Sequence, residues 1–163
     1  MGGDAASRAP GPDAQAASGN AKPGGYAGDI SVDESWRLLE SDPSAVLVDV
    51  RTQAEWSYVG VPDLSALSRQ PLLIEWQSFP SGAVNPAFGE ELAGLLGPDR
   101  RDVPVLFICR SGARSKAAAI ALTGQGFTRC YNISSGFEGD LDSQRHRGSR
   151  NGWKAAGLPW AQS

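Results

Sequence analysis

Residues that bind transition metals are scarce in this sequence, which has two cysteines and one histidine among its 163 residues. A structural zinc site usually needs about four such ligands, and Cys109 and Cys130 are too far apart for a Cys-x-x-Cys pair. We therefore expect no metal, no other cofactor and no thioredoxin-type redox chemistry.

Long apolar segments and an excess of basic charge are also absent. No apolar run approaches the roughly 20 residues of a membrane span, and the first residues lack the apolar core of a signal peptide. Acidic residues outnumber basic ones by 18 to 15, whereas nucleic-acid binding needs a net basic face. These absences predict a cytoplasmic protein with reduced thiols that binds neither membrane nor nucleic acid.

Aromatic residues are nearly missing from the first 28 positions, where Tyr26 is the only one. This segment consists mainly of Gly, Ala, Pro, Ser and Asp, which bury too little apolar surface to offset the entropy of ordering. All five Trp and all five Phe follow it. We interpret residues 1–28 as a flexible tail and residues 29–163 as one folded domain.

Short apolar runs in the second part of the chain have the composition of buried strands. They lie at residues 45–50, 72–76, 103–108 and 130–133. Such runs are typical of a parallel sheet whose two faces are both covered.

Helix signals lie between these runs. Ser31 and Thr52 each precede a glutamate by three residues, which is the spacing of a capping box. The pair Asn85-Pro86 predicts a third helix start, the alanine-rich residues 115–122 a fourth helix, and residues 153–156 a last short one. The alternation predicts an α/β fold with a central parallel sheet flanked by helices.

The strand predicted to end at Ile108 runs directly into a short loop that begins with Cys109. Ligands of parallel sheets bind at the carboxyl ends of the strands. Gly112 would let the loop amides form an anion-binding nest at a helix N-terminus, beside two arginines. These features predict a reactive thiolate at Cys109 and an anion-binding loop of Arg110, Ser111, Gly112, Ala113, Arg114 and Ser115. The alternative is a cysteine that merely fills the core.

Three segments in this order resemble the single-domain rhodanese (rhodanese-like sulfurtransferase) family. One is the loop with Cys109, Gly112, Arg114 and Ser115. The others are residues 47–51 followed by Glu55-Trp56, and residues 152–160. The resemblance covers nearly all of residues 29–163 and implies a rhodanese-like fold.

The resemblance implies a thiosulfate sulfurtransferase-like enzyme. Cys109 would take a sulfane sulfur from a small anionic donor, hold it as a persulfide, and pass it to cyanide or a thiol; any protein acceptor is unidentified. It also implies that Asp49, Arg51 and Glu55 support the site. On physical grounds, Asp49 at a strand end could hold a loop guanidinium by a bidentate pair. The alternative for Asp49 and Glu55 is helix capping.

Two other functions remain open at this point. Phosphatases that share the fold place five residues between cysteine and arginine, whereas four separate Cys109 from Arg114. The other is a rhodanese-like interaction or sulfur-carrier module without independent turnover; non-catalytic interaction modules often lack the cysteine, which this chain retains. We predict that Cys130 only packs in the core and that His146 is only exposed.

Two segments depart from the family pattern. The turn Gly-His-Ile-Pro-Gly-Ala is replaced by Gly60-Val-Pro62-Asp-Leu64, and residues 140–151 form a polar insertion. We predict that the insertion arginines, Arg145, Arg147 and Arg150, attract the anionic donor. The alternative is a solvated surface loop.

Overall fold

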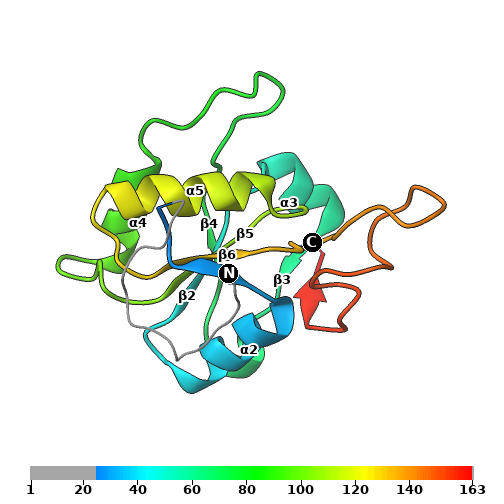
Figure 1. Cartoon of the computed structure of the whole chain (residues 1–163), viewed down its shortest axis with the longest axis horizontal. Coiled ribbons are helices and arrows are strands. Elements are labelled where there is room, and N and C mark those ends of the chain that lie inside the picture. Colours follow the sequence, from blue (N-terminus) through cyan, green and yellow to red (C-terminus); the bar gives the residue numbers. More distant parts are fainter. Residues whose placement is uncertain (1–24, 163) are drawn as a thin grey trace.

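The computed structural model describes residues 25–162 (Figure 1). Most of the expected tail, residues 1–24, lies outside the described residues, so its flexibility stays a prediction. Tyr26 and Ala27 are buried, and the Ala27 amide donates to the Cys130 carbonyl oxygen at 2.9 Å. The packed domain therefore includes these two residues.

The central sheet has five parallel strands in the order β1-β6-β5-β2-β4. This arrangement confirms the predicted parallel α/β fold. The strands are β1 (Gly28–Ile30), β6 (Cys130–Ile133), β5 (Val105–Ile108), β2 (Val46–Asp49) and β4 (Leu72–Leu73). β4 is shorter than the apolar run that predicted it.

Within residues 25–162, four helices flank the sheet: α2 (Val32–Ser41), α3 (Gln53–Val59), α4 (Phe88–Leu96) and α5 (Ala113–Gly124). Both predicted capping boxes, at Ser31 and Thr52, are formed. The third helix begins later than predicted, because Asn85 accepts from the Ala87 amide in a turn that precedes α4. No helix within residues 25–162 is long and apolar enough to cross a membrane.

The last predicted helix, at residues 153–156, is wrong. This segment forms turns, in which the Ala156 amide donates to the Gly152 carbonyl oxygen at 3.0 Å. Gly157 has a φ of 77°, and this left-handed conformation ends the turn before a helix can extend.

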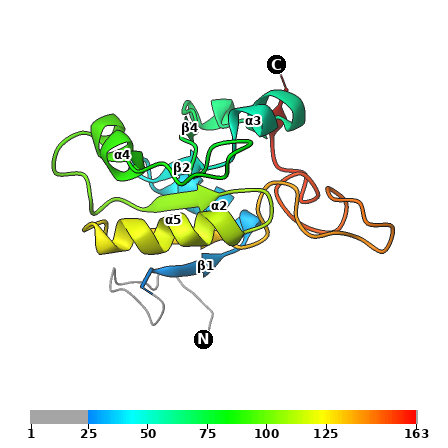
Figure 2. The ribbon, with the colours of Figure 1, turned by 90° about the horizontal axis from the view of Figure 1, so that it is seen from above.

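The two faces of the sheet carry separate apolar cores. Figure 1 shows α4 and α5 on one side and α2 on the other. Alternate strand residues point to opposite faces, so Phe107 packs under α4 and α5 while Leu106 packs on the side of α2. Figure 2 shows the segment after β6 beside the end of the sheet where β5 leads into α5.

A second, small sheet and one short helix complete the fold. β3 (Val61–Pro62) pairs antiparallel with β7 (Trp160–Ala161). The 3-10 helix η1 (Ser65–Leu67) leads from β3 toward β4. The pairing ties the end of the described chain to the segment after α3.

Candidate functional site

Cys109 follows the last residue of β5 and lies at the carboxyl ends of the parallel strands, as predicted. Its side chain is almost completely buried. The amide of Gly112, the residue before α5, donates to the sulfur atom at 3.1 Å. The Ser115 hydroxyl oxygen also lies 3.1 Å from the sulfur. The sulfur therefore faces a helix N-terminus, where the backbone dipoles favour negative charge.

Backbone hydrogen bonds from the segment after β6 fix the position of the cysteine loop. The Phe137 amide donates to the Cys109 carbonyl oxygen at 2.8 Å, and the Glu138 amide to the Arg110 carbonyl oxygen at 3.0 Å. Gly112 has a φ of 113°, and a Cβ atom there would lie 2.3 Å from the Ser134 carbonyl oxygen. Sequence reasoning missed this support, although glycines at 136 and 139 mark a tight turn.

Arg114 is held by Glu55 on α3. Its Nη1 and Nη2 atoms donate to the two carboxylate oxygens at 2.7 and 2.9 Å, which is a bidentate pair. Glu55 also accepts from the Thr52 amide in the capping box. The carboxylate that positions the loop arginine is therefore Glu55 and not Asp49, which the strand-end argument had indicated.

Asp49 instead binds Arg51, two residues along the chain. Both side chains are fully buried; Arg51 Nε donates to Asp49 Oδ1 at 2.9 Å and Nη2 to Oδ2 at 2.5 Å. The guanidinium also donates to the Gly60 carbonyl oxygen and lies 4.3 Å from the centre of the Phe137 ring. Both oxygens of the Asp49 carboxylate therefore accept from Arg51, and Arg114 pairs with Glu55 instead.

The pair between Glu55 and Arg114 makes stability depend on pH. Burial works to raise the pKa of Glu55, but hydrogen bonds and charge from Arg114, with the Thr52 amide, lower it from 4.5 to about 2. A carboxyl with a depressed pKa in the folded state contributes stability above its unfolded pKa and loses it as the pH falls toward the folded value. We therefore expect an acid-labile contribution on the order of 2 kcal/mol, after allowing for solvent screening.

The expected loss falls between about pH 4.5 and about pH 2. Urea unfolding across this range should show a smaller loss for Glu55→Gln than for the wild type. Glu90→Gln, at an exposed carboxylate on α4, is the matched control and should follow the wild type. Identical acid profiles for wild type and Glu55→Gln would contradict the stabilising role of the pair.

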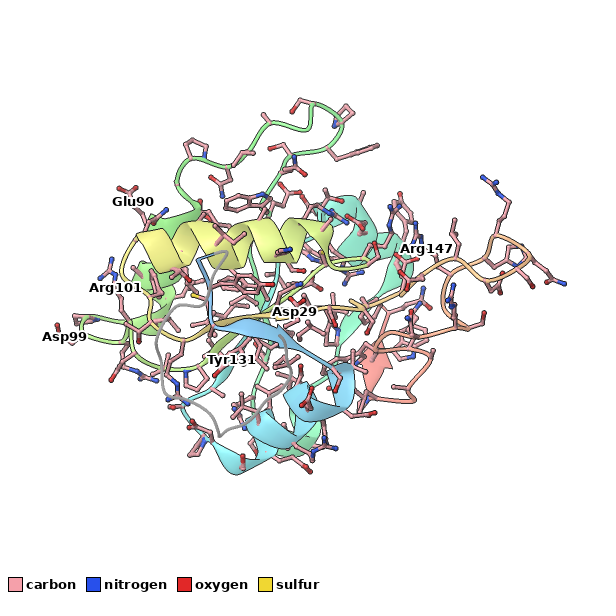
Figure 3. The ribbon with its side chains drawn as sticks, viewed as in Figure 1. Asp29, Glu90, Asp99, Arg101, Tyr131 and Arg147 are labelled. Atoms are coloured by element: carbon pink, nitrogen blue, oxygen red, sulfur yellow. The ribbon has the colours of Figure 1, made fainter. Side chains whose placement is uncertain are left out.

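A cleft of about 1020 Å³ opens above the cysteine loop. Arg110, Arg114 and Glu55 line it, whereas the buried Cys109 does not, and two further segments, here called its walls, also contribute to the lining. One wall is the loop with Phe79 and Pro80; the other is the insertion, with Leu141, Arg145, His146 and Arg147. Figure 3 shows the segment that carries Arg147 beside α3.

The walls were only partly predicted. The insertion borders the site, as its position suggested, but Arg150 is not among the lining residues. His146 is exposed, as predicted, and also lines the cleft. The wall around Phe79 was not predicted, because nothing local in that loop marks it as part of the cleft lining.

The second cysteine, Cys130, lies outside the cysteine loop. It lies fully buried on β6, and burial raises the pKa of its thiol to about 12. It therefore stays protonated at neutral pH and packs in the core. Within residues 25–162 no cluster of three or more His, Cys, Asp or Glu side chains is arranged to hold a metal ion.

Comparison with known proteins gives consistent matches. The profile of the rhodanese-like domain matches residues 31–142. An uncharacterized protein of Rickettsia rickettsii, the RP600 homolog, is 37% identical over 127 residues, which are 78% of this chain and 91% of that protein. The thiosulfate sulfurtransferase GlpE of Actinobacillus pleuropneumoniae is 27% identical over 131 residues, 80% of this chain and 90% of that protein.

A solved structure agrees with the fold. The crystal structure of Rv0390 from M. tuberculosis is 50% identical in sequence and superposes with a TM-score of 0.76. The match covers 85% of this chain and 99% of that one.

Proposed function

Since this chain belongs to the rhodanese-like domain family, we propose that it is a sulfurtransferase that moves a sulfane sulfur from an anionic donor to a thiophilic acceptor through Cys109. The observation that carries the proposal is the position of the Cys109 sulfur, within 3.1 Å of the Gly112 amide at the start of α5. The sequence similarity of this chain to the thiosulfate sulfurtransferase GlpE supports the same reaction class.

In the first half-reaction, the Cys109 thiolate attacks the sulfane sulfur of a donor such as thiosulfate. A sulfur–sulfur bond forms to Cys109, the donor's own sulfur–sulfur bond breaks, and its electron pair leaves with sulfite. The product is a persulfide whose terminal sulfur carries the negative charge. Arg110 and Arg114 line the cleft and supply positive charge for the incoming anion.

In the second half-reaction, the acceptor takes the terminal sulfur. The carbon of cyanide, or the sulfur of a thiolate, attacks that atom, and the persulfide bond breaks. The electron pair returns to the Cys109 sulfur, which regains its thiolate form. The Gly112 amide donates to the Cys109 sulfur and stabilises the charge that develops there.

The length of the loop favours sulfur over phosphoryl chemistry. Four residues separate Cys109 from Arg114, one fewer than in phosphatases that share the fold. A tighter ring of backbone amides fits one terminal sulfur atom better than the three equatorial oxygens of a transferring phosphoryl group. We therefore expect a persulfide and not a phosphoryl-enzyme.

The proposal is tested by assaying the full chain in parallel with thiosulfate plus cyanide and with an aryl phosphate. Catalytic release of thiocyanate and sulfite, with negligible phosphate release, is the expected result. Phosphate release without sulfur uptake would replace the proposal with a phosphatase. Persulfide formation with no onward transfer to cyanide or small thiols would replace it with a sulfur-carrier module.

The insertion arginines are proposed to steer the donor into the cleft. We expect Arg145→Gln with Arg147→Gln to lower the second-order rate with thiosulfate about threefold or more at low ionic strength, because opposite charge speeds diffusional encounter. The deficit should shrink as salt screens the field. Stopped-flow measurement of sulfite release over a salt series gives these rates.

Arg150→Gln is the matched control, since Arg150 lies on the same insertion but does not line the cleft. Its rate should stay close to that of the wild type. Equal rates for all variants at low salt would mean that the insertion is only a solvated surface loop.

A further inference from the structure

A chain of hydrogen bonds leads from the Cys109 sulfur through the protein, away from the cleft. Ser115 Oγ donates to Asn132 Oδ1 at 2.6 Å, and Asn132 Nδ2 donates to Asp29 Oδ1 at 3.0 Å. The Tyr26 hydroxyl donates to the same Asp29 oxygen at 2.8 Å. Ser115 and Asn132 are buried, whereas Asp29, labelled in Figure 3, lies on the edge strand β1. The mechanism above uses none of Tyr26, Asp29 and Asn132.

The direction of each hydrogen bond in this chain is fixed by Asp29. An ionised carboxylate only accepts, so Asn132 presents its NH₂ group to Asp29 and its carbonyl oxygen to Ser115. Burial, with a hydrogen bond and charge from Asp29, raises the pKa of Tyr26 well above its usual range, so its hydroxyl remains a donor. The Asn132 side chain therefore cannot reverse without losing its bond to Asp29.

This order decides where the only proton of the Ser115 hydroxyl points. Asn132 Oδ1 can only accept, so Ser115 must donate to it. Ser115 then turns lone pairs toward the Cys109 sulfur, 3.1 Å away, and can accept from a thiol S–H but cannot donate to a thiolate. Asn132 and an anionic sulfur thus compete for one proton.

We propose that Asn132 is a positioning residue that controls, through the Ser115 hydroxyl, the charge state of the Cys109 sulfur. With a neutral sulfur the hydroxyl proton stays on the Asn132 side. When the sulfur becomes a thiolate, the hydroxyl rotates and exchanges a neutral hydrogen bond for a charge-assisted one. The thiol proton leaves to solvent when the sulfur ionises, and the rotation of the Ser115 hydroxyl itself makes and breaks no covalent bond.

In the sulfur-transfer reaction, which rests on the proposed function, the same rotation would accompany the second half-reaction. The sulfur attached to Cβ is uncharged in the persulfide, and it gains an electron pair when the acceptor removes the terminal sulfur. The Ser115 hydroxyl then donates its hydrogen bond to the leaving thiolate instead of to Asn132, and its O–H bond stays intact. While the sulfur is in the persulfide form, Asn132 accepts the hydrogen bond of the Ser115 hydroxyl and keeps that side chain in place.

Other charged groups also surround Cys109 and act on its charge. Arg114 on α5 is paired with Glu55 on α3, the buried pair of Asp49 and Arg51 lies at the end of β2, and Arg110 lies in the loop itself. Asp29 faces it from β1 through Asn132. A substitution at Asn132 leaves all these charges in place, so a shift in thiol reactivity would come through Ser115.

The test is the pH profile of Cys109 alkylation by iodoacetamide in the full chain, followed by mass spectrometry. Asn132→Leu is similar in size and removes the competing acceptor. We expect its half-maximal rate about half to one pH unit lower than in the wild type, which corresponds to one hydrogen bond. Ser115→Ala removes the donor and should move the half-maximal rate upward.

The double variant Asn132→Leu with Ser115→Ala identifies the route, because it should match Ser115→Ala alone. Asp29→Asn provides a second case at an exposed position, since it frees the Asn132 amide to reverse. The pH of its half-maximal alkylation rate should also be lower than in the wild type. The same Asp29→Asn change in the Ser115→Ala background measures the effect of the lost charge alone, and the shift with Ser115 present should be larger than that.

An upward or absent shift in both Asn132→Leu and Asp29→Asn would overturn the proposal. A shift that persists in full without the Ser115 hydroxyl would overturn it as well. Alkylation needs no sulfur donor or acceptor, so this result stands apart from the outcome of the sulfurtransferase assay.

Discussion

Replacing Cys109 with serine should abolish sulfur uptake from thiosulfate completely. A serine hydroxyl occupies the same place beside the Gly112 amide but has no thiolate to attack the sulfane sulfur. After incubation with thiosulfate, the intact wild-type protein should be one sulfur atom heavier by mass spectrometry. Cyanide should remove that extra mass and release thiocyanate, whereas Cys109→Ser should show neither step.

Cys130→Ala is the matched control for this experiment. Cys130 is buried on β6, and its thiol, with a pKa of about 12, stays protonated at neutral pH. The variant should therefore take up and release sulfur like the wild type. Sulfur uptake that survives in Cys109→Ser, or that is lost only in Cys130→Ala, would contradict the assignment of Cys109 as the reactive thiol.

The second large effect is expected from Gly112→Ala, which should cost about 3 to 5 kcal/mol of stability. The φ of 113° is strained for any residue with a Cβ atom. That atom would lie 2.3 Å from the backbone oxygen of Ser134, a residue whose amide is held by a hydrogen bond to the Ile30 carbonyl oxygen at 3.1 Å. The amide that donates to the Cys109 sulfur would be displaced, so activity should fall with stability.

Gly94→Ala tests the same substitution without these constraints. Gly94 lies in α4, has no atoms within 4 Å of the added Cβ, and does not have a positive φ. Alanine there should stabilise the protein by about 0.5 to 1 kcal/mol, because glycine is a poor residue for a helix interior. Denaturant unfolding of both variants gives the comparison, and a wild-type stability for Gly112→Ala would show that the loop is not held as tightly as described.

Local sequence signals predicted the elements that depend on local chemistry. The capping boxes at Ser31 and Thr52 and the buried strands β2, β5 and β6 were predicted because their patterns are complete within a few residues. β1 was missed, since Gly28–Ile30 is three residues long and gains its strand geometry only by pairing with β6. The turn at residues 153–156 has helix-forming residues but is closed by flanking glycines.

The site divides in the same way. Cys109 and its loop form one continuous segment, so their position could be predicted from strand end, glycine and arginines. Which of Asp49 and Glu55 pairs with Arg114 could not be predicted, because it depends on which carboxylate is already paired with another arginine. The link from Ser115 through Asn132 to Asp29 joins three separate elements and has no signal in any one of them.

The construction of the cleft walls has a consequence for how such a protein can diversify. No residue at positions 77–87 or 140–151 is buried or packs against the two apolar cores, so both walls lie outside those cores. Insertions, deletions and substitutions in these segments would leave most of the folding free energy unchanged. Exchange of either wall by recombination or loop grafting is therefore a low-cost route to new donor and acceptor preferences on an unaltered cysteine loop.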